Sequence, residues 1–175
     1  GIRDKLVTGV QTCALPICLV ALALRPRSTG GGITTPMKGR MPDWAMKDLD
    51  GRTVAGSNLV GRILFINFWA TYCPPCRAEV GDFVEFTQST PTNQVMILGA
   101  STDESPGEVV PGFAKSYKIN YPMLIADGRT QEQFGGVFAI PTTFIVNRRG
   151  EFQARHIGPM TRKDLERWVT ALSKE

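Results

Sequence analysis

A chain of 175 residues, of which 42% are hydrophobic and 21% charged, has the size and composition of one soluble globular domain with little left over. The net charge of +4 comes from Lys and Arg residues scattered among Asp and Glu, and without a basic run or aromatic–basic stripe it argues against nucleic acid as a partner. Four cysteines are too few for a disulfide-stapled scaffold of this length.

The start of the chain does not resemble a natural protein segment. Residues 7–17 read VTGVQTCALPI, which looks like the in-frame translation of a common short-read sequencing adapter, and the residues before them match the upstream primer and index. We therefore expect residues 1–17 to be foreign to the natural protein, with Cys13 inside that segment and Cys18 at its junction. On that expectation, a zinc site built from all four cysteines is not predicted. Without the adapter match, residues 1–24 would resemble a secretory signal.

Residues 18–40 form a second segment without the pattern of a folded element. The apolar run at 19–24 is too short to span a bilayer. It is interpreted as the last turns of a truncated signal or membrane anchor, or as a fragment without meaning. Residues 25–40 are rich in Gly, Pro, Ser and Thr, a composition that cannot bury a core and indicates a flexible linker. The folded domain is therefore expected at residues 41–175.

Strand and helix patterns alternate after this expected linker. A small hairpin is predicted over 47–54, where Asp50 and Gly51 supply the turn. A nearly continuous run of strand formers predicts a buried strand at 63–68, and a helix with prolines in its first turn is predicted at 74–88. The remaining predicted elements are a strand at 95–98, a helix at 109–117, a strand at 123–125, a short helix at 130–134, strands at 143–146 and 152–157, and a capped helix at 161–172. This order predicts an α/β fold with a mixed central sheet flanked by helices.

Cys73 and Cys76 lie directly after a predicted buried strand and at the start of a predicted helix. At a helix N-terminus, Cys73 meets unpaired backbone N–H groups and the positive end of the helix dipole, and both favour the thiolate. Cys76, one turn further on, can attack a mixed disulfide and release the partner. We therefore predict a redox site in which Cys73 is the nucleophile and Cys76 the resolving thiol. The alternative, half of a zinc ribbon, is disfavoured because residues 41–175 contain no second Cys pair and only His156, which we interpret as structural.

Several segments of the chain together have a recognisable pattern. Residues 67–79 read NFWATYCPPCRAE, residues 42–44 and 48–51 read PDW and DLDG, and residues 140–146 read IPTTFIV. These segments resemble the TlpA/ResA/CcmG-type thioredoxin-like proteins, and the resemblance extends over 42–172. It implies a thioredoxin-like fold with an N-terminal hairpin extension. It also implies a location outside the cytoplasm, in the periplasm or at the outer face of the cytoplasmic membrane, with a membrane anchor in the intact protein.

The resemblance also assigns residues to the surroundings of the cysteines. It implies that Pro141 is a cis-proline facing the disulfide, where Ile140 and Pro141 form an exposed strand edge that pairs with the backbone of a partner. Trp69, Tyr72 and Pro74 complete the implied substrate-binding surface, with Trp69 interpreted as packing rather than chemistry. Tyr72 departs from the Trp more common in the family and keeps an aromatic wall beside the site.

Glu79 is the candidate proton acceptor. Asn67 stands where ordinary thioredoxins have a buried Asp, and an amide cannot take up a proton at that position. Glu79 follows Cys76 by three residues and therefore shares its helix face. A half-buried carboxylate there would have a raised pKa and could take the Cys76 proton. The alternative is a solvated helix glutamate.

These observations predict an extracytoplasmic thiol–disulfide oxidoreductase of the cytochrome c maturation type. It would reduce particular protein disulfides, such as those of apocytochrome c, with electrons from a membrane donor, and with no cofactor or metal besides its own disulfide. Two alternatives share the fold. A peroxiredoxin-like peroxidase would need Pro and Thr or Ser at the positions of Ile66 and Ala70. A Sco-like copper-binding chaperone would have three residues between its cysteines and a suitably placed His.

Overall fold

The computed structural model describes residues 31–174. The predictions for residues 1–17, including Cys13, and for the apolar run at 19–24 lie outside the described residues. Within the described part of the chain, no helix has both the length and the apolar character needed to cross a membrane.

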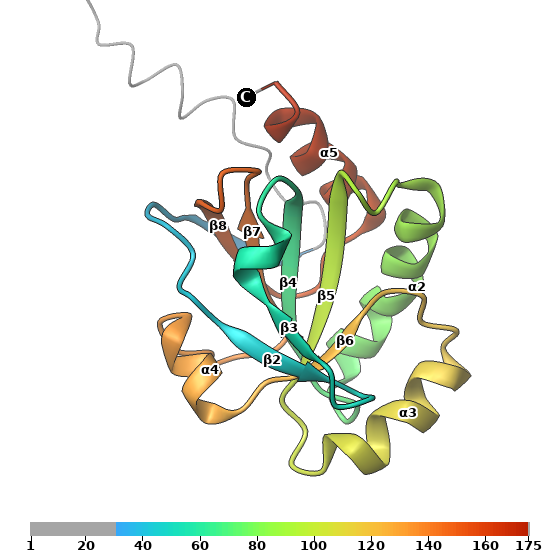
Figure 1. Cartoon of the computed structure of the whole chain (residues 1–175). Helices are drawn as coiled ribbons and strands as arrows, with labels where there is room; N and C mark the ends of the chain where they lie inside the picture. Colours follow the sequence, from blue (N-terminus) through green and yellow to red (C-terminus); the bar gives the residue numbers. More distant parts are fainter. Residues whose placement is uncertain (1–30, 175) are drawn as a thin grey trace, which may run out of the picture.

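A single mixed sheet forms the centre of residues 31–174 (Figure 1). Its strands are β1 (Ile33–Pro36), β2 (Ala45–Asp48), β3 (Thr53–Ala55), β4 (Ile63–Trp69), β5 (Val95–Ser101), β6 (Met123–Ile125), β7 (Thr142–Val146) and β8 (Phe152–Ile157). Their order across the sheet is β1-β8-β7-β4-β5-β6-β2-β3. The β4–β5 and β5–β6 pairs are parallel and the others antiparallel, as predicted for a mixed sheet.

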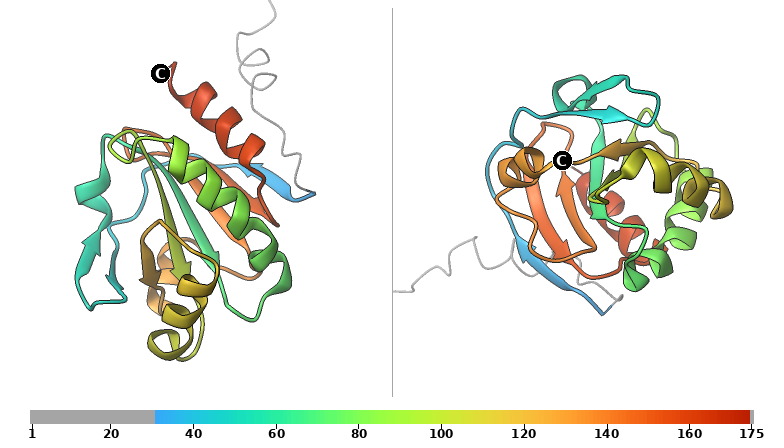
Figure 2. Two further views of the ribbon diagram at one scale, coloured as in Figure 1. Left: turned by 90° about the vertical axis from the view of Figure 1, so that its right-hand side faces the viewer. Right: turned by 90° about the horizontal axis from the view of Figure 1, so that it is seen from below.

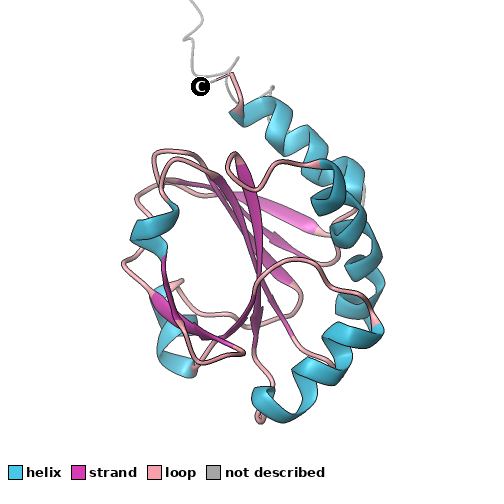
Figure 3. Cartoon of the chain, turned by 45° about the vertical axis from the view of Figure 1, so that its right-hand side comes forward, coloured by secondary structure: helices cyan, strands magenta, loops and turns pink. Residues whose placement is uncertain are grey.

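Helices cover both faces of this sheet (Figure 3). The helical segments are η1 (Gly56–Leu59), α2 (Pro74–Ser89), α3 (Pro106–Ser116), α4 (Gly128–Gln133) and α5 (Arg162–Leu172). Because side chains alternate along a strand, β4 supplies both halves of the core. Phe65 packs with Phe83 of α2 and Trp168 of α5, whereas Phe68 packs on the other face with Phe134, which follows α4.

The starts of the elements follow the predicted local signals. The β2–β3 hairpin turns through Gly51 at φ +79°, and the Asp48 carboxylate accepts the N–H groups of Asp50 and Arg52. This hairpin pairs through β2 with β6, so the N-terminal hairpin extends the sheet as the resemblance implied. The capping box predicted for the last helix is present at Thr161.

The sheet begins earlier than the expected domain start at residue 41. Ile33–Pro36, inside the segment interpreted as a linker, form β1 and pair antiparallel with β8 at the outer edge of the sheet (Figure 2). The strand is short and its one large apolar side chain, Ile33, is 70% exposed, so its sequence carries no periodic apolar signal. The pairing with β8 makes residues 33–36 a strand, although the composition of residues 25–40 indicated a flexible linker. The helix predicted at 109–117 likewise starts earlier, at Pro106, which occupies the first turn of α3.

Candidate active site

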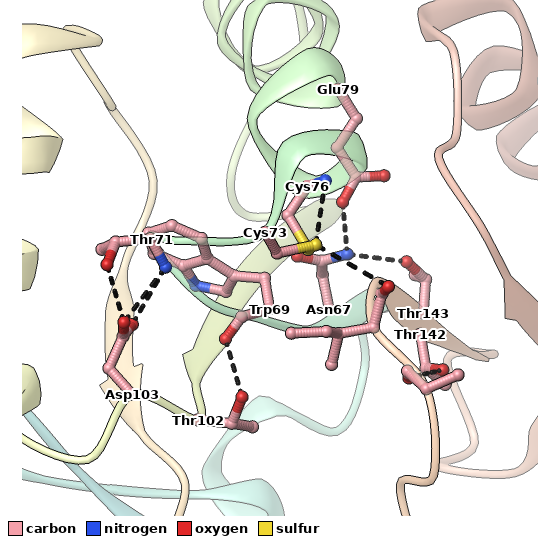
Figure 4. The surroundings of a disulfide bond; sticks show 12 residues. Asn67, Trp69, Thr71, Cys73, Cys76, Glu79, Thr102, Asp103, Thr142 and Thr143 are labelled. Carbon is pink, nitrogen blue, oxygen red and sulfur yellow. Dashed lines mark hydrogen bonds between the residues drawn. A yellow bond between two sulfur atoms is a disulfide. The ribbon is translucent and has the colours of Figure 1, made fainter.

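Cys73 and Cys76 form a disulfide at the start of α2, just beyond the carboxyl end of β4 (Figure 4). Cys73 is the N-cap residue, and its Sγ accepts the N–H of Cys76 at 3.3 Å. Pro74 and Pro75 occupy the intervening positions and have no N–H to donate. The cap therefore provides the Cys73 sulfur with one backbone donor and the helix dipole, the two features expected to favour its thiolate.

The segment before β7 lies against the same sulfur. The Ile140–Pro141 peptide bond is cis, as the resemblance implied. The carbonyl oxygen of Ile140 lies 3.7 Å from the Cys73 Sγ. Among residues 31–174, neither the N–H nor the C=O of Ile140 takes part in a backbone–backbone hydrogen bond outside the regular elements. The Ile140 backbone thus borders the disulfide and has no backbone–backbone partner of this kind.

Glu79 is more deeply buried than the sequence predicted, since only 3% of its surface is exposed. The side-chain amide of Asn67 donates to Oε1 at 2.9 Å, and the backbone N–H of Met160 donates to Oε2 at 2.9 Å. Burial raises the pKa of the Glu79 carboxyl from 4.5 to about 8, although the two hydrogen bonds act in the opposite direction. That pKa is close to the ordinary thiol value of about 8.5, so a proton can pass between such groups with little driving force either way.

Asn67 connects this carboxyl to the sheet. Its amide nitrogen also donates to the Thr143 hydroxyl of β7 at 3.0 Å, so the amide lies between β7 and the Glu79 carboxyl (Figure 4). The pairing of Asn67 with Thr143 across the β4–β7 ladder fixes this position. Asn67 therefore orients Glu79 without titrating itself.

The two aromatic residues before Cys73 differ in exposure. Trp69 is 2% exposed and packs against Phe113 of α3 with ring centroids 5.0 Å apart. It belongs to an apolar cluster with both cysteines, which agrees with its interpretation as packing. Tyr72, in contrast, is 68% exposed and directly precedes Cys73.

Comparison with known proteins decides the family. Residues 37–155 match the model of the AhpC/TSA family. The chain belongs to this family. Sporulation thiol-disulfide oxidoreductase A of Bacillus subtilis is 30% identical, over 71% of this chain and 76% of its own length. The thiol-disulfide oxidoreductase ResA of Halalkalibacterium halodurans is 29% identical, over 76% of this chain and 75% of its own length.

Solved structures match the fold of this AhpC/TSA-family chain. A thiol:disulfide interchange protein of the thioredoxin family from Chlorobium tepidum has a TM-score of 0.70 and 26% identity, covering 79% of this chain and 98% of its own. StoA from Bacillus subtilis has a TM-score of 0.62 and 27% identity, covering 77% and 98%. The predicted thioredoxin-like fold, the resemblance to the TlpA/ResA/CcmG type and the thiol–disulfide oxidoreductase activity are confirmed.

Three contacts of this AhpC/TSA-family site were not predicted. Asp103 accepts the N–H and the hydroxyl of Thr71, the latter at 2.7 Å, and thereby holds the turn that leads into Cys73. Because β4 and β5 are parallel and end at the same sheet edge, the position of Asp103 just after β5 is a signal that could have predicted this contact. The contact of Thr143 with Asn67 could not be predicted, because Thr143 is an ordinary strand residue. The contact of the Met160 N–H with Glu79 could not be predicted either, because it comes from a backbone group distant in sequence.

His156 lies apart from the disulfide, on β8. Its Nδ1 is 2.8 Å from the Thr34 hydroxyl and its Nε2 is 3.3 Å from the Pro159 carbonyl oxygen. Burial lowers the pKa of His156, so the neutral ring is favoured. These contacts agree with a structural role. Within residues 31–174, no three His, Cys, Asp or Glu side chains are grouped as metal ligands.

Proposed function

We propose that this thiol–disulfide oxidoreductase works outside the cytoplasm and reduces particular protein disulfides. The observation that carries the proposal is the position of the Cys73 sulfur. It caps α2, accepts one backbone N–H, and lies 3.7 Å from the carbonyl oxygen of Ile140. A partner backbone paired at Ile140 would hold its own sulfur over Cys73.

The proposed reaction moves two electrons from the enzyme to the partner. The Cys73 thiolate attacks one sulfur of the partner disulfide, forms a mixed disulfide and releases the other partner sulfur as a thiolate, which takes a proton from water. The Cys76 thiol then gives its proton to the Glu79 carboxylate and attacks the Cys73 sulfur. The Cys73–Cys76 disulfide forms and the second partner sulfur leaves. The described disulfide is the oxidised product of this half-reaction.

Burial supports the order of attack. Cys73 is 6% exposed and Cys76 is 1% exposed, so the sulfur of Cys73 is the one that a large partner can approach. Glu79 shares the helix face of Cys76, and its pKa of about 8 suits a base that takes a proton from a thiol and returns it to water. Tyr72, Pro74, Ile140 and Pro141 border the approach to Cys73 and are proposed to contact the partner.

The location and partners follow from the resemblance and the redox chemistry. Protein disulfides form and persist in oxidising compartments, so an enzyme that acts on them would meet its partners at the periplasmic or outer membrane face. There, a membrane donor would return the pair to the dithiol form. Apocytochrome c, whose cysteines must be reduced, is a partner of the proposed class.

Insulin-disulfide reduction tests the assignment of the two cysteines. The unaltered protein should be active, Cys73→Ser inactive, and Cys76→Ser should accumulate mixed disulfides, because it can begin the exchange but not resolve it. A limiting amount of iodoacetamide should label Cys73 first in the reduced protein. Preferential labelling of Cys76 would reverse the roles, and peroxide consumption faster than insulin reduction would favour the peroxidase alternative.

A further inference from the structure

The loop between α4 and β7, which leads to Ile140 and Pro141, exposes an aromatic ring. Phe138 is 91% exposed, the largest exposure among the large hydrophobic residues of the described chain. A phenylalanine that contacts so little of its own protein leaves its apolar surface in water, where burial against a partner would be favourable.

The neighbouring residues present this ring outward. Val137 packs against the core cluster that contains Phe134, whereas the Phe138 side chain is exposed. Gly135 and Gly136 precede it with φ values of +82° and +84°, a conformation that favours glycine. The Phe138 ring lies over Gly136, where a Cβ atom would clash with it. The two glycines thus allow the loop to turn and leave room for the exposed ring.

Chain connectivity limits the distance between Phe138 and the residue that contacts the reacting sulfur. Ile140, two residues later, contacts the Cys73 Sγ through its carbonyl oxygen at 3.7 Å. Two residues of extended chain span at most about 7 Å, so the Cα atom of Phe138 lies within that distance of the Cα atom of Ile140. The Ala139 carbonyl accepts the Thr142 hydroxyl at 2.6 Å, which ties this short connection to β7.

A partner that pairs with the Ile140 backbone, as proposed above, would lie beside this loop. Residues 135–141 read GGVFAIP and contain no charged side chain. The exposed Tyr72 adds a second aromatic surface directly before Cys73. An apolar side chain near the partner's cysteine would lose less hydration by docking here than a charged or hydroxylated one.

We propose that Phe138 is a specificity-determining residue that binds an apolar side chain next to the cysteine of an extended partner segment. This inference rests on the proposed function and names the class of partner sequence. Phe138 takes no part in the exchange of sulfurs, so its effect is on partner choice rather than on chemistry.

The test compares two symmetric peptide disulfides that differ only in the residues flanking the cysteine, Leu in one and Ser in the other. The unaltered full chain, reduced beforehand, should be oxidised by the Leu peptide with a second-order rate constant about tenfold higher than by the Ser peptide. Phe138→Ala should reduce this preference to within about twofold while the rates with the Ser peptide and with glutathione disulfide stay the same. Phe138→Leu should retain most of the preference. Val109→Ala, which trims another exposed apolar side chain on α3, is the matched control and should retain all of it.

Several outcomes would overturn the inference. If Phe138→Ala keeps the preference for the Leu peptide, the ring does not contribute to partner choice. If its rates fall equally with the two peptides and glutathione disulfide, the ring has a structural role in the loop. If Phe138→Ala converts a dimer to a monomer in sedimentation, the ring binds a second copy of the chain instead. If the unaltered protein reduces neither peptide nor insulin, the proposed function fails; if it reduces both peptides equally, only this inference fails.

Discussion

Replacing Glu79 by Gln removes a titrating group from the protein interior and keeps its size and shape. Glu79 is 3% exposed, and its pKa rises from 4.5 to about 8 because burial disfavours the charged form. The substitution should therefore alter how the stability of the oxidised protein depends on pH, and in a direction that can be worked out in advance.

The raised pKa sets both the sign and the size of the effect. Below pH 4.5 the carboxyl is neutral in the folded and unfolded chains, and its burial carries no ionisation cost. As the pH rises, the unfolded chain ionises and the folded chain does not, so the free energy of unfolding falls by about 1.4 kcal/mol per pH unit. Since the folded pKa is about 8, the loss is complete near that pH and amounts to at most about 5 kcal/mol. Glu79→Gln should lack this decline.

The site can accept the new amide. With Glu79, the Asn67 amide nitrogen donates both to Oε1 and to the Thr143 hydroxyl. With Gln at this position, the Asn67 amide can turn over, so that its oxygen accepts from the Gln amide and from the Thr143 hydroxyl. The Gln oxygen would still accept the Met160 N–H. The hydrogen-bond count is therefore preserved, and the comparison isolates the titration.

Guanidinium unfolding of the oxidised protein at several values from pH 4.5 to 9 measures the effect. The curve of the unaltered protein should fall relative to that of Glu79→Gln across this range. Glu85→Gln, an exposed glutamate on the same helix, is the matched control and should follow the unaltered protein. Parallel curves for the unaltered protein and Glu79→Gln would refute the raised pKa.

Kinetic measurements then test whether Glu79 acts as a base or is only a buried neutral group. If Glu79 takes the Cys76 proton, release of the partner from the mixed disulfide should slow in Glu79→Gln by about a hundredfold, the low end of the range for general base catalysis. Formation of the mixed disulfide by Cys73 should not change. If both steps have the same rates in Glu79→Gln as in the unaltered protein between pH 5 and 9, Glu79 has a structural role only.

Two further predictions concern the potential and the edge strand. The protein should be more reducing than about −200 mV, nearer thioredoxin at about −270 than DsbA at about −120, because the prolines of the first turn leave few donors on the Cys73 sulfur. Equilibration with glutathione measures this, and a value near −120 mV would contradict a reductant. Thr34→Val should cost about 1 to 3 kcal/mol, since the buried His156 loses a hydrogen-bond partner, whereas Thr35→Val on the exposed side of β1 should cost less. Equal losses in denaturant unfolding would show that the Thr34 contact adds nothing.

Local signals predicted the parts of the fold that local chemistry determines. The apolar run that became β4 is buried along its whole length, because a central strand is covered on both faces. The N-cap of α2 is Cys73, and the prolines that follow it predicted the start of this helix. The N-cap of α5 is Thr161, and its capping box predicted the start of that helix. The redox pair could be predicted for the same reason, since its chemistry depends on a helix N-terminus that the sequence itself indicates.

Contacts between distant segments could not be predicted in this way. Strand β1 is specified by its pairing with β8, not by an apolar face of its own. The group that donates to Glu79 from Met160 is a backbone N–H, which every residue except proline has, so the residue type at 160 could not predict this hydrogen bond. Phe138 would be assigned to the core by its hydrophobicity, and its exposure follows only from the loop that Val137 anchors.

Asn67 shows how sequence and structure together define the chemistry of this site. The sequence indicated that an amide here cannot take up a proton, and a second carboxylate in its place would face Glu79 across a buried contact. Like charges that close would raise the Glu79 pKa further and remove the base from the physiological range. The Asn67 amide instead donates to Glu79, and with the Met160 N–H it lowers a pKa that burial alone would raise beyond about 8. The amide thus keeps the pKa of Glu79 close to that of an ordinary thiol, as the proposed proton transfer from Cys76 requires.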